Sequence, residues 1–248
     1  MSPPPLELAD FSLTDFEHPT GLKEQYCSNQ RISLVLQRGR LPMAWSDFRL
    51  WDEHGALLLK CVDCFAVFQD HKWIKTRDND VVYTMISFDG NIAVDIHEGL
   101  APAYGPGRGS EYATCVDSPG PKRDISVDFW DFQSKLVIQW RLIFINDRDH
   151  AVLLTPEGAV AKISKGRWWF SPYHIEVGKN VDYSLVMMAV IASCVVGTHG
   201  DLLNPTMDQV FTNNIDLMRD NGYEEQLGKR EDRTDPEVHN IFIKPHPA

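Results

Sequence analysis

The sequence predicts a mostly β protein in which a closed antiparallel barrel surrounds one apolar helix. Two observations lead to this fold: about ten to twelve short strand-like segments, and one uncharged run, YSLVMMAVIASCVVGT, at 183–198. A helix over that run spans roughly 24 Å, short of the ~30 Å hydrocarbon core of a bilayer. The run is apolar on every side, so protein or lipid must surround it. A closed barrel has no exposed edges but needs a filled interior, which this helix supplies.

The strand-like segments are separated by turn residues along most of the chain. In order they are 32–38, 47–52, 56–62, 64–70, 73–78, 81–87, 91–97, 125–132, 135–146, 151–156, 159–165 and 173–177, with a further short segment at 111–116. The clusters at 53–55, 78–80 and 89–90 contain Gly, Asn and Asp, which favour tight reversals. We expect the helix at about 182–197, with Asn180 and Asp182 as candidate N-caps.

Composition divides the chain into three parts. Residues 1–30 are Pro-rich and polar and predict a loosely ordered lead-in, and residues 31–200 hold the barrel with a Gly/Pro-rich insertion at 99–123. Residues 201–248 form a C-terminal extension, in which 206–220 suggests an amphipathic helix and 239–245 a short strand.

Charge and cysteine content limit the classes of partner. The net charge is −11 and the pI about 5.2, which argues against nucleic-acid binding. The N-terminus has no basic and apolar stretches typical of a signal peptide. The five cysteines are sparse and odd in number, which fits a reducing compartment. We therefore expect a soluble cytoplasmic protein without an integral membrane span.

We expect no metal ion and no cofactor. Cys61 and Cys64 have C-x-x-C spacing, but a structural zinc site needs a second pair, and positions i and i+3 of a strand face opposite sides. The Gly-rich segment 105–109 lacks the Lys-Ser/Thr of a phosphate loop and opens no helix.

Two stretches resemble the LURP-one-related proteins. The first stretch has a strand and turn with Phe48, Leu50, Asp52 and Gly55, followed by the apolar residues 57–59. A second hairpin with another Asp-containing turn follows, and its residues are Trp73, Asp78 and 81–85. In the second, Val177, Val181, Asp182 and Tyr183 stand at the positions of a "V-x-x-x-V-D-Y-A" pattern that leads into an apolar helix. The resemblance covers roughly residues 30–197. It implies a tubby C-terminal-like fold, shared with tubby proteins and phospholipid scramblases, in which twelve strands surround a central helix.

Three hypotheses for function stay open at this point. The first is a binding module for a lipid, a small apolar or anionic ligand, or a protein partner. Basic residues interleaved with aromatic ones suit such a ligand, and the candidate binding residues are Lys165, Arg167, Trp168, Trp169 and Lys179. In tubby proteins basic residues bind phosphoinositides.

The second hypothesis is an enzyme, such as an isomerase, cyclase or hydrolase of a small natural product. Asp95 and His97 share one face of a strand, so a carboxylate could orient a general base there. His174 and Tyr104 are the other candidate catalytic residues at the barrel rim. The third hypothesis, a scramblase-like membrane protein, requires residues 183–198 to enter the bilayer.

Overall fold

The computed structural model describes residues 7–39, 47–64, 71–88, 93–100, 111–118, 124–145, 150–166 and 171–195. Within these ranges the strands are β1 (Ile32–Arg38), β2 (Phe48–Asp52), β3 (Leu57–Cys64), β4 (His71–Thr76), β5 (Val81–Phe88), β6 (Ala93–Glu98), β7 (Glu111–Ser118), β8 (Asp124–Trp130), β9 (Val137–Ile145), β10 (His150–Thr155), β11 (Gly158–Lys165) and β12 (Tyr173–Val177). Helix α1 spans Tyr183–Val195, and two 3-10 helices are η1 (Leu8–Asp10) and η2 (Glu24–Tyr26).

The twelve described strands form one closed antiparallel barrel. Neighbours in the barrel are neighbours in the chain, and β12 closes the ring by pairing with β1, where Leu34 lies opposite Ile175. Closure leaves no strand edge unpaired along the ring, so the barrel offers no template for edge-to-edge association. The predicted fold class is therefore confirmed. Of the strand predicted at 64–70, residues 65–70 lie outside the described residues.

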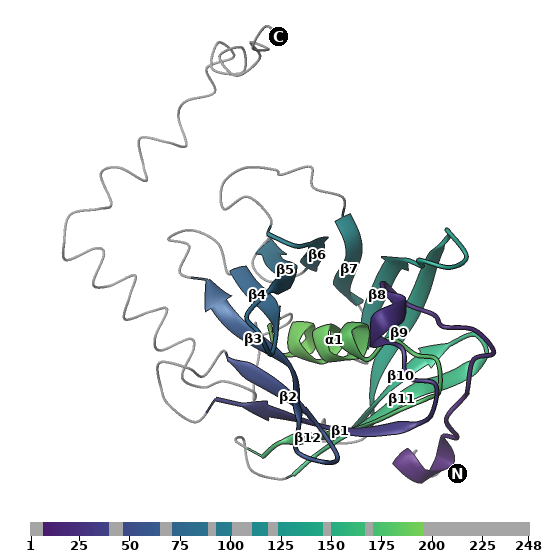
Figure 1. The fold of residues 1–248 in the computed structure, drawn as a ribbon. Helices are drawn as coiled ribbons and strands as arrows, with labels where there is room; N and C mark the ends of the chain where they lie inside the picture. Colours follow the sequence, from purple (N-terminus) through teal and green to yellow (C-terminus); the bar gives the residue numbers. More distant parts are fainter. Residues whose placement is uncertain are drawn as a thin grey trace, which may run out of the picture. The chain divides into compact units, whose positions relative to one another are not determined.

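Helix α1 lies inside the barrel (Figure 1). Every residue from Leu185 to Ala192 is at most 2% exposed, and the inward-facing Leu36, Leu50 and Ile96 are fully buried around them. Strand walls on all sides supply the apolar contacts that an all-round apolar helix requires. No helix in the described part of the chain is long and apolar enough to cross a membrane.

Asp182 starts the helix, as predicted, and also ties it to the N-terminal segment. One carboxylate oxygen accepts hydrogen bonds from the backbone N–H groups of Ser184 (2.8 Å) and Leu185 (3.2 Å) and from the Ser184 hydroxyl (2.6 Å). The other oxygen accepts from the N–H groups of Leu22 (2.9 Å) and Lys23 (3.1 Å). The carboxylate is thus a helix cap and a tertiary link at once.

Asn180 is not an N-cap, contrary to the prediction. Its backbone has a positive φ of 62°, and its side-chain amide donates hydrogen bonds to the carbonyl oxygens of Phe16 (2.9 Å) and Glu17 (3.1 Å). Asn tolerates the left-handed conformation better than most residues, and here its amide holds a neighbouring segment.

The prediction of a loosely ordered lead-in is wrong for residues 7–30. Their backbone N–H groups pair with the barrel: Thr14 donates to the carbonyl of Ala159, and Phe16 to that of Lys179. Leu22 and Tyr26 are buried in the main hydrophobic core. The prolines are concentrated in residues 1–6, which lie outside the described residues. Residues 101–110 and 119–123 of the predicted insertion also lie outside them, as do residues 196–248, which include the predicted C-terminal extension.

Candidate functional site

The candidate catalytic residues do not come together. Asp95 and His97 both point outward from β6, because Val94 and Ile96, which alternate with them, take the inward positions. His174 is exposed on β12, which lies halfway around the twelve-strand ring from β6. Tyr104 lies outside the described residues.

The Asp95 and His97 side chains occupy different environments on the same face. Asp95 accepts a hydrogen bond from the Thr114 hydroxyl at 3.1 Å. His97 is 7% exposed, and its Nδ1 atom has no hydrogen-bond partner among the described residues. No hydrogen bond or ion pair joins Asp95 to His97 within the described part of the chain, so the carboxylate-oriented base stays a hypothesis.

The candidate ligand-binding lysines also lie apart. Lys165 stacks its ammonium group over the Tyr173 ring at 5.3 Å, and the Tyr173 hydroxyl lies 3.3 Å from Cys194 Sγ near the end of α1. Lys179 is at the opposite end of β12, where its backbone N–H donates to Asp15. Arg167, Trp168 and Trp169 lie outside the described residues. Their role in binding therefore stays a prediction.

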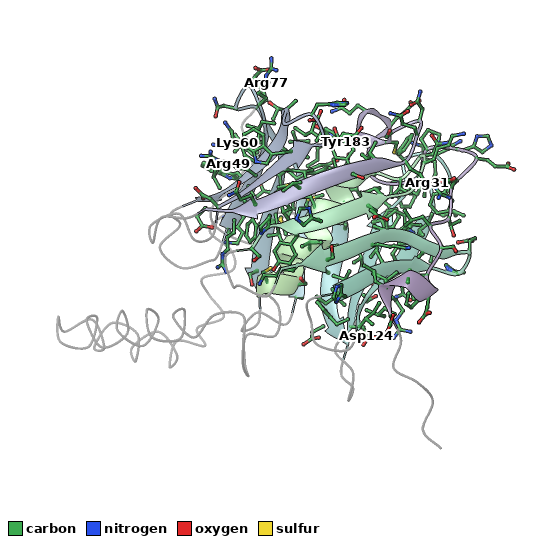
Figure 2. The ribbon with its side chains drawn as sticks, turned by 90° about the horizontal axis from the view of Figure 1, so that it is seen from below. Arg31, Arg49, Lys60, Arg77, Asp124 and Tyr183 are labelled. Atoms are coloured by element: carbon green, nitrogen blue, oxygen red, sulfur yellow. The ribbon has the colours of Figure 1, made fainter. Side chains whose placement is uncertain are left out.

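A different group of cations is brought together by the strand register. Arg49 on β2 lies directly opposite Lys60 on β3, and Lys60 lies directly opposite Lys75 on β4. Neighbouring strands are about 4.8 Å apart, so the three Cα atoms form a row roughly 10 Å long. The row points outward, because Phe48, Leu50, Cys61 and Ile74 take the inward positions beside it. Figure 2 shows Arg49, Lys60 and Arg77 on one side of the barrel, away from Arg31 and Asp124. We call Arg49, Lys60, Lys75 and Arg77 the basic face.

In the described ranges, carboxylates do not neutralise the cations of this row. None of Arg49, Lys60 and Lys75 takes part in a salt bridge with a described residue. Lys60 donates instead to the Asn79 side-chain oxygen at 2.5 Å, and the Lys75 ammonium lies 4.6 Å from the centre of the Trp73 ring. Arg77 has only a 4.0 Å contact with Asp78, both side chains being more than 70% exposed. The positive charge of the row is therefore available to an anion.

This arrangement is energetically unfavourable for the barrel itself. Like charges placed directly opposite on neighbouring strands destabilise a sheet, by roughly 0.2–1 kcal/mol per pair. The chain carries a net charge of −11, so carboxylates to neutralise the row are abundant in its composition. Within the described part of the chain, this row of three cations has no carboxylate partner, which makes it a candidate site for an anionic ligand.

Residues from separate strands form the basic face, so the sequence alone did not predict it. Arg49, Lys60 and Lys75 lie on three consecutive strands, and no sequence motif joins them. Only the pairing register across β2, β3 and β4 aligns them, and that register includes an irregularity between Leu50 and Trp51. The sequence shows that polar Arg49 alternates with apolar Phe48 and Leu50. This alternation does not tell which residue of β3 lies opposite Arg49.

Among the described residues, no cluster of three or more His, Cys, Asp or Glu side chains is placed to hold a metal ion. Cys61 faces the buried interior of the barrel, and Cys64 ends β3. Burial raises the pKa of the Cys115 thiol to about 12, so this cysteine is a protonated core residue.

The closed twelve-stranded barrel with a central apolar helix defines a tubby-like fold. Comparison with solved structures agrees: the chain is similar to the X-ray structure of an Arabidopsis thaliana protein, AT5G01750, with a TM-score of 0.51 and 16% sequence identity. The match covers 68% of this chain and 93% of that chain. No protein-family model and no curated protein matches the sequence. At this level of identity the likeness shows the fold alone.

Proposed function

We propose that this chain is a LURP-one-related, tubby-like binding module that uses its basic face to bind an anionic, phosphate-bearing ligand such as a lipid head group. The in-register row of Arg49, Lys60 and Lys75 carries this proposal. The order of the family-like motifs and the likeness of the fold support the choice of family.

A filled interior directs binding to the outer surface. Helix α1 occupies the barrel, and its residues from Leu185 to Ala192 are at most 2% exposed, so the interior has no room for a ligand there. The outer wall of β2–β4 is different, because it combines cations that have no described carboxylate partner with the half-buried Trp51 on β2 and Trp73 on β4. Lysine and arginine supply the charge, and the amphipathic indole suits the boundary between water and lipid.

The acidic net charge of the chain does not cancel the attraction at this face. At physiological ionic strength the Debye length is about 8 Å, so carboxylates farther away are largely screened. Each lysine or arginine close to an anionic membrane surface contributes roughly 1 kcal/mol to binding. The three cations of the row together give weak, reversible and salt-sensitive association.

Co-sedimentation with lipid vesicles tests the proposal. We expect the chain to sediment with phosphatidylcholine vesicles that contain phosphatidylserine or phosphoinositides, and not with pure phosphatidylcholine vesicles. Binding weakens as salt rises, and inositol hexakisphosphate competes if phosphate groups are what the face recognises. Equal binding to neutral and anionic vesicles, or none to either, would contradict the proposal.

The enzyme hypothesis gains no support from the described residues. Acid–base catalysis needs its groups within hydrogen-bonding reach of one substrate. Asp95 and His97 lie on β6, whereas His174 lies on the far side of the ring. We therefore propose the binding module rather than an isomerase, cyclase or hydrolase.

A further inference from the structure

A second surface, independent of the basic face, exposes apolar side chains at the hairpin that joins β8 and β9. Val137 is 68% exposed, Leu136 64% and Trp130 45%, and Trp130 and Val137 face each other across the two strands. Among the described residues, the other large apolar side chain with such exposure is Leu100. A cluster of three on one hairpin is unlike the scattered exposed apolar residues of an ordinary surface.

A surface depression lies against the same hairpin. It has a volume of about 480 Å³ and is lined by Leu22, Lys23, Glu24, Gln25 and Phe132. Phe132 belongs to the turn of the hairpin, which stands in the chain between Trp130 and Leu136. We call the depression together with Trp130, Leu136 and Val137 the hairpin surface.

Hydrogen bonds fix both walls of the depression. The Phe132 N–H donates to the Gly21 carbonyl at 3.0 Å, and the Gly21 N–H donates to the Asp131 carboxylate at 2.8 Å. On the other side, the N–H groups of Leu22 and Lys23 donate to the buried Asp182. A site whose walls are already held in place loses little conformational entropy when a partner binds.

The charges at the depression favour a cationic partner. Lys23 is neutralised by Glu98, with 2.6 Å between Nζ and Oε1. Glu24 is exposed and forms no ion pair with any described residue, so its carboxylate is the uncompensated charge in the lining. Lys135 lies in the same hairpin turn, but its side chain does not line the depression.

We infer that the hairpin surface binds a protein segment that presents one large apolar side chain beside a lysine or arginine. The apolar side chain would enter the depression against the half-buried Phe132, and the cation would pair with Glu24. Leu136, Val137 and Trp130 would cover the flanking residues of the segment. An apolar anchor in a preformed pocket, enclosed by weaker contacts, is the usual arrangement of a binding hot spot.

Selection of random peptides displayed on phage against the immobilised full chain provides a test. We expect the enriched peptides to share an aromatic or large aliphatic residue next to a lysine or arginine. A synthetic consensus peptide should bind the Leu136→Ser/Val137→Thr variant at least about tenfold more weakly than the native chain. Both replaced side chains are exposed, so the barrel should keep its stability.

A double-mutant cycle measures how much the Glu24 charge contributes to peptide binding. Glu24→Gln should weaken binding of the consensus peptide several-fold, and it should have no effect on a peptide whose cation is replaced by a neutral residue. Arg49→Gln/Lys75→Gln, on the basic face, should leave peptide binding unchanged.

Three outcomes would overturn the inference. One is the absence of a shared peptide motif, or a motif whose binding does not respond to Leu136→Ser/Val137→Thr. The second is a dimer of this chain that those substitutions convert to a monomer, because the occupant would then be a second copy. The third is loss of vesicle binding in the same variant, because the hairpin would then be a lipid contact.

Discussion

Gly21 and Asp182 meet where the N-terminal segment crosses the start of α1. Gly21 has a φ of +147°, and a Cβ atom placed on it would lie 2.1 Å from Cβ of Asp182. Asp182 is fully buried and accepts hydrogen bonds from Leu22, Lys23, Ser184 and Leu185. Burial raises the pKa of this carboxyl, while those donors oppose the rise. A glycine is therefore the residue that lets the segment approach the cap.

We predict that Gly21→Ala destabilises the chain by about 2–4 kcal/mol, measured by urea unfolding, because it adds a close contact to an unfavourable φ. Gly55→Ala is the matched control. Gly55 also has a positive φ, of 78°, but a Cβ atom there would meet nothing within 4 Å. Its cost should stay near the 1–2 kcal/mol of the left-handed conformation alone. Equal effects of the two substitutions would show that the approach to Asp182 does not matter.

Glu98 makes stability depend on pH at the same end of the barrel. Hydrogen bonds from Lys23 and Tyr112 hold the pKa of Glu98 below its ordinary value of 4.5. Because the folded-state pKa is the lower one, this contribution to stability is present above the unfolded value. It is lost as pH falls through the folded value.

Glu98→Gln should therefore cost about 1 kcal/mol at pH 7, where the charge-assisted contacts exist in the native chain. The difference between variant and native chain should shrink below about pH 4 and vanish at lower pH, as followed by thermal unfolding across a pH series. A difference that is constant with pH would mean that the carboxylate charge is not responsible.

At the scale of the strands, the basic face should cost stability. Arg49→Gln/Lys75→Gln removes both like-charge pairs and keeps the bond from Lys60 to Asn79. We predict that this variant unfolds at a slightly higher temperature than the native chain, with a gain of about 0.5–2 kcal/mol. Residues kept against stability are typical of binding surfaces. A loss of stability in differential scanning calorimetry would show that the row is a structural feature.

The strands and the helix were largely predictable because their patterns are local. Alternation in β2 and turn residues such as Asn79 place strands and reversals, and an apolar run as long as α1 has few alternative locations. The ordered path of residues 7–30 was missed because its contacts, such as Thr14 with Ala159, join distant parts of the chain. The basic face was missed for a different reason: its strands are consecutive, but the residue opposite Arg49 depends on register, which a single sequence does not reveal.

At the scale of the whole molecule, a barrel filled by its own helix leaves binding to the outer wall. Each candidate surface then depends on strands that the closed ring places side by side: β2–β4 for the basic face, and β8–β9 for the hairpin surface. The sequence predicted a ligand site that includes Lys165 and Lys179, and the structure separates these two residues. The binding site is thus expected either at the basic face or near β12. The two possibilities predict opposite results when the same number of positive charges is removed from each surface.

The most direct measurement compares the binding of two double variants to anionic vesicles by co-sedimentation at one salt concentration. Arg49→Gln/Lys75→Gln and Lys165→Gln/Lys179→Gln change the net charge equally, so a non-specific charge effect would weaken both alike. We predict that the first loses roughly 2 kcal/mol of binding, about thirtyfold in partitioning, while the second binds like the native chain. Equal losses, or a loss confined to the second variant, would contradict the assignment of the basic face as the binding site.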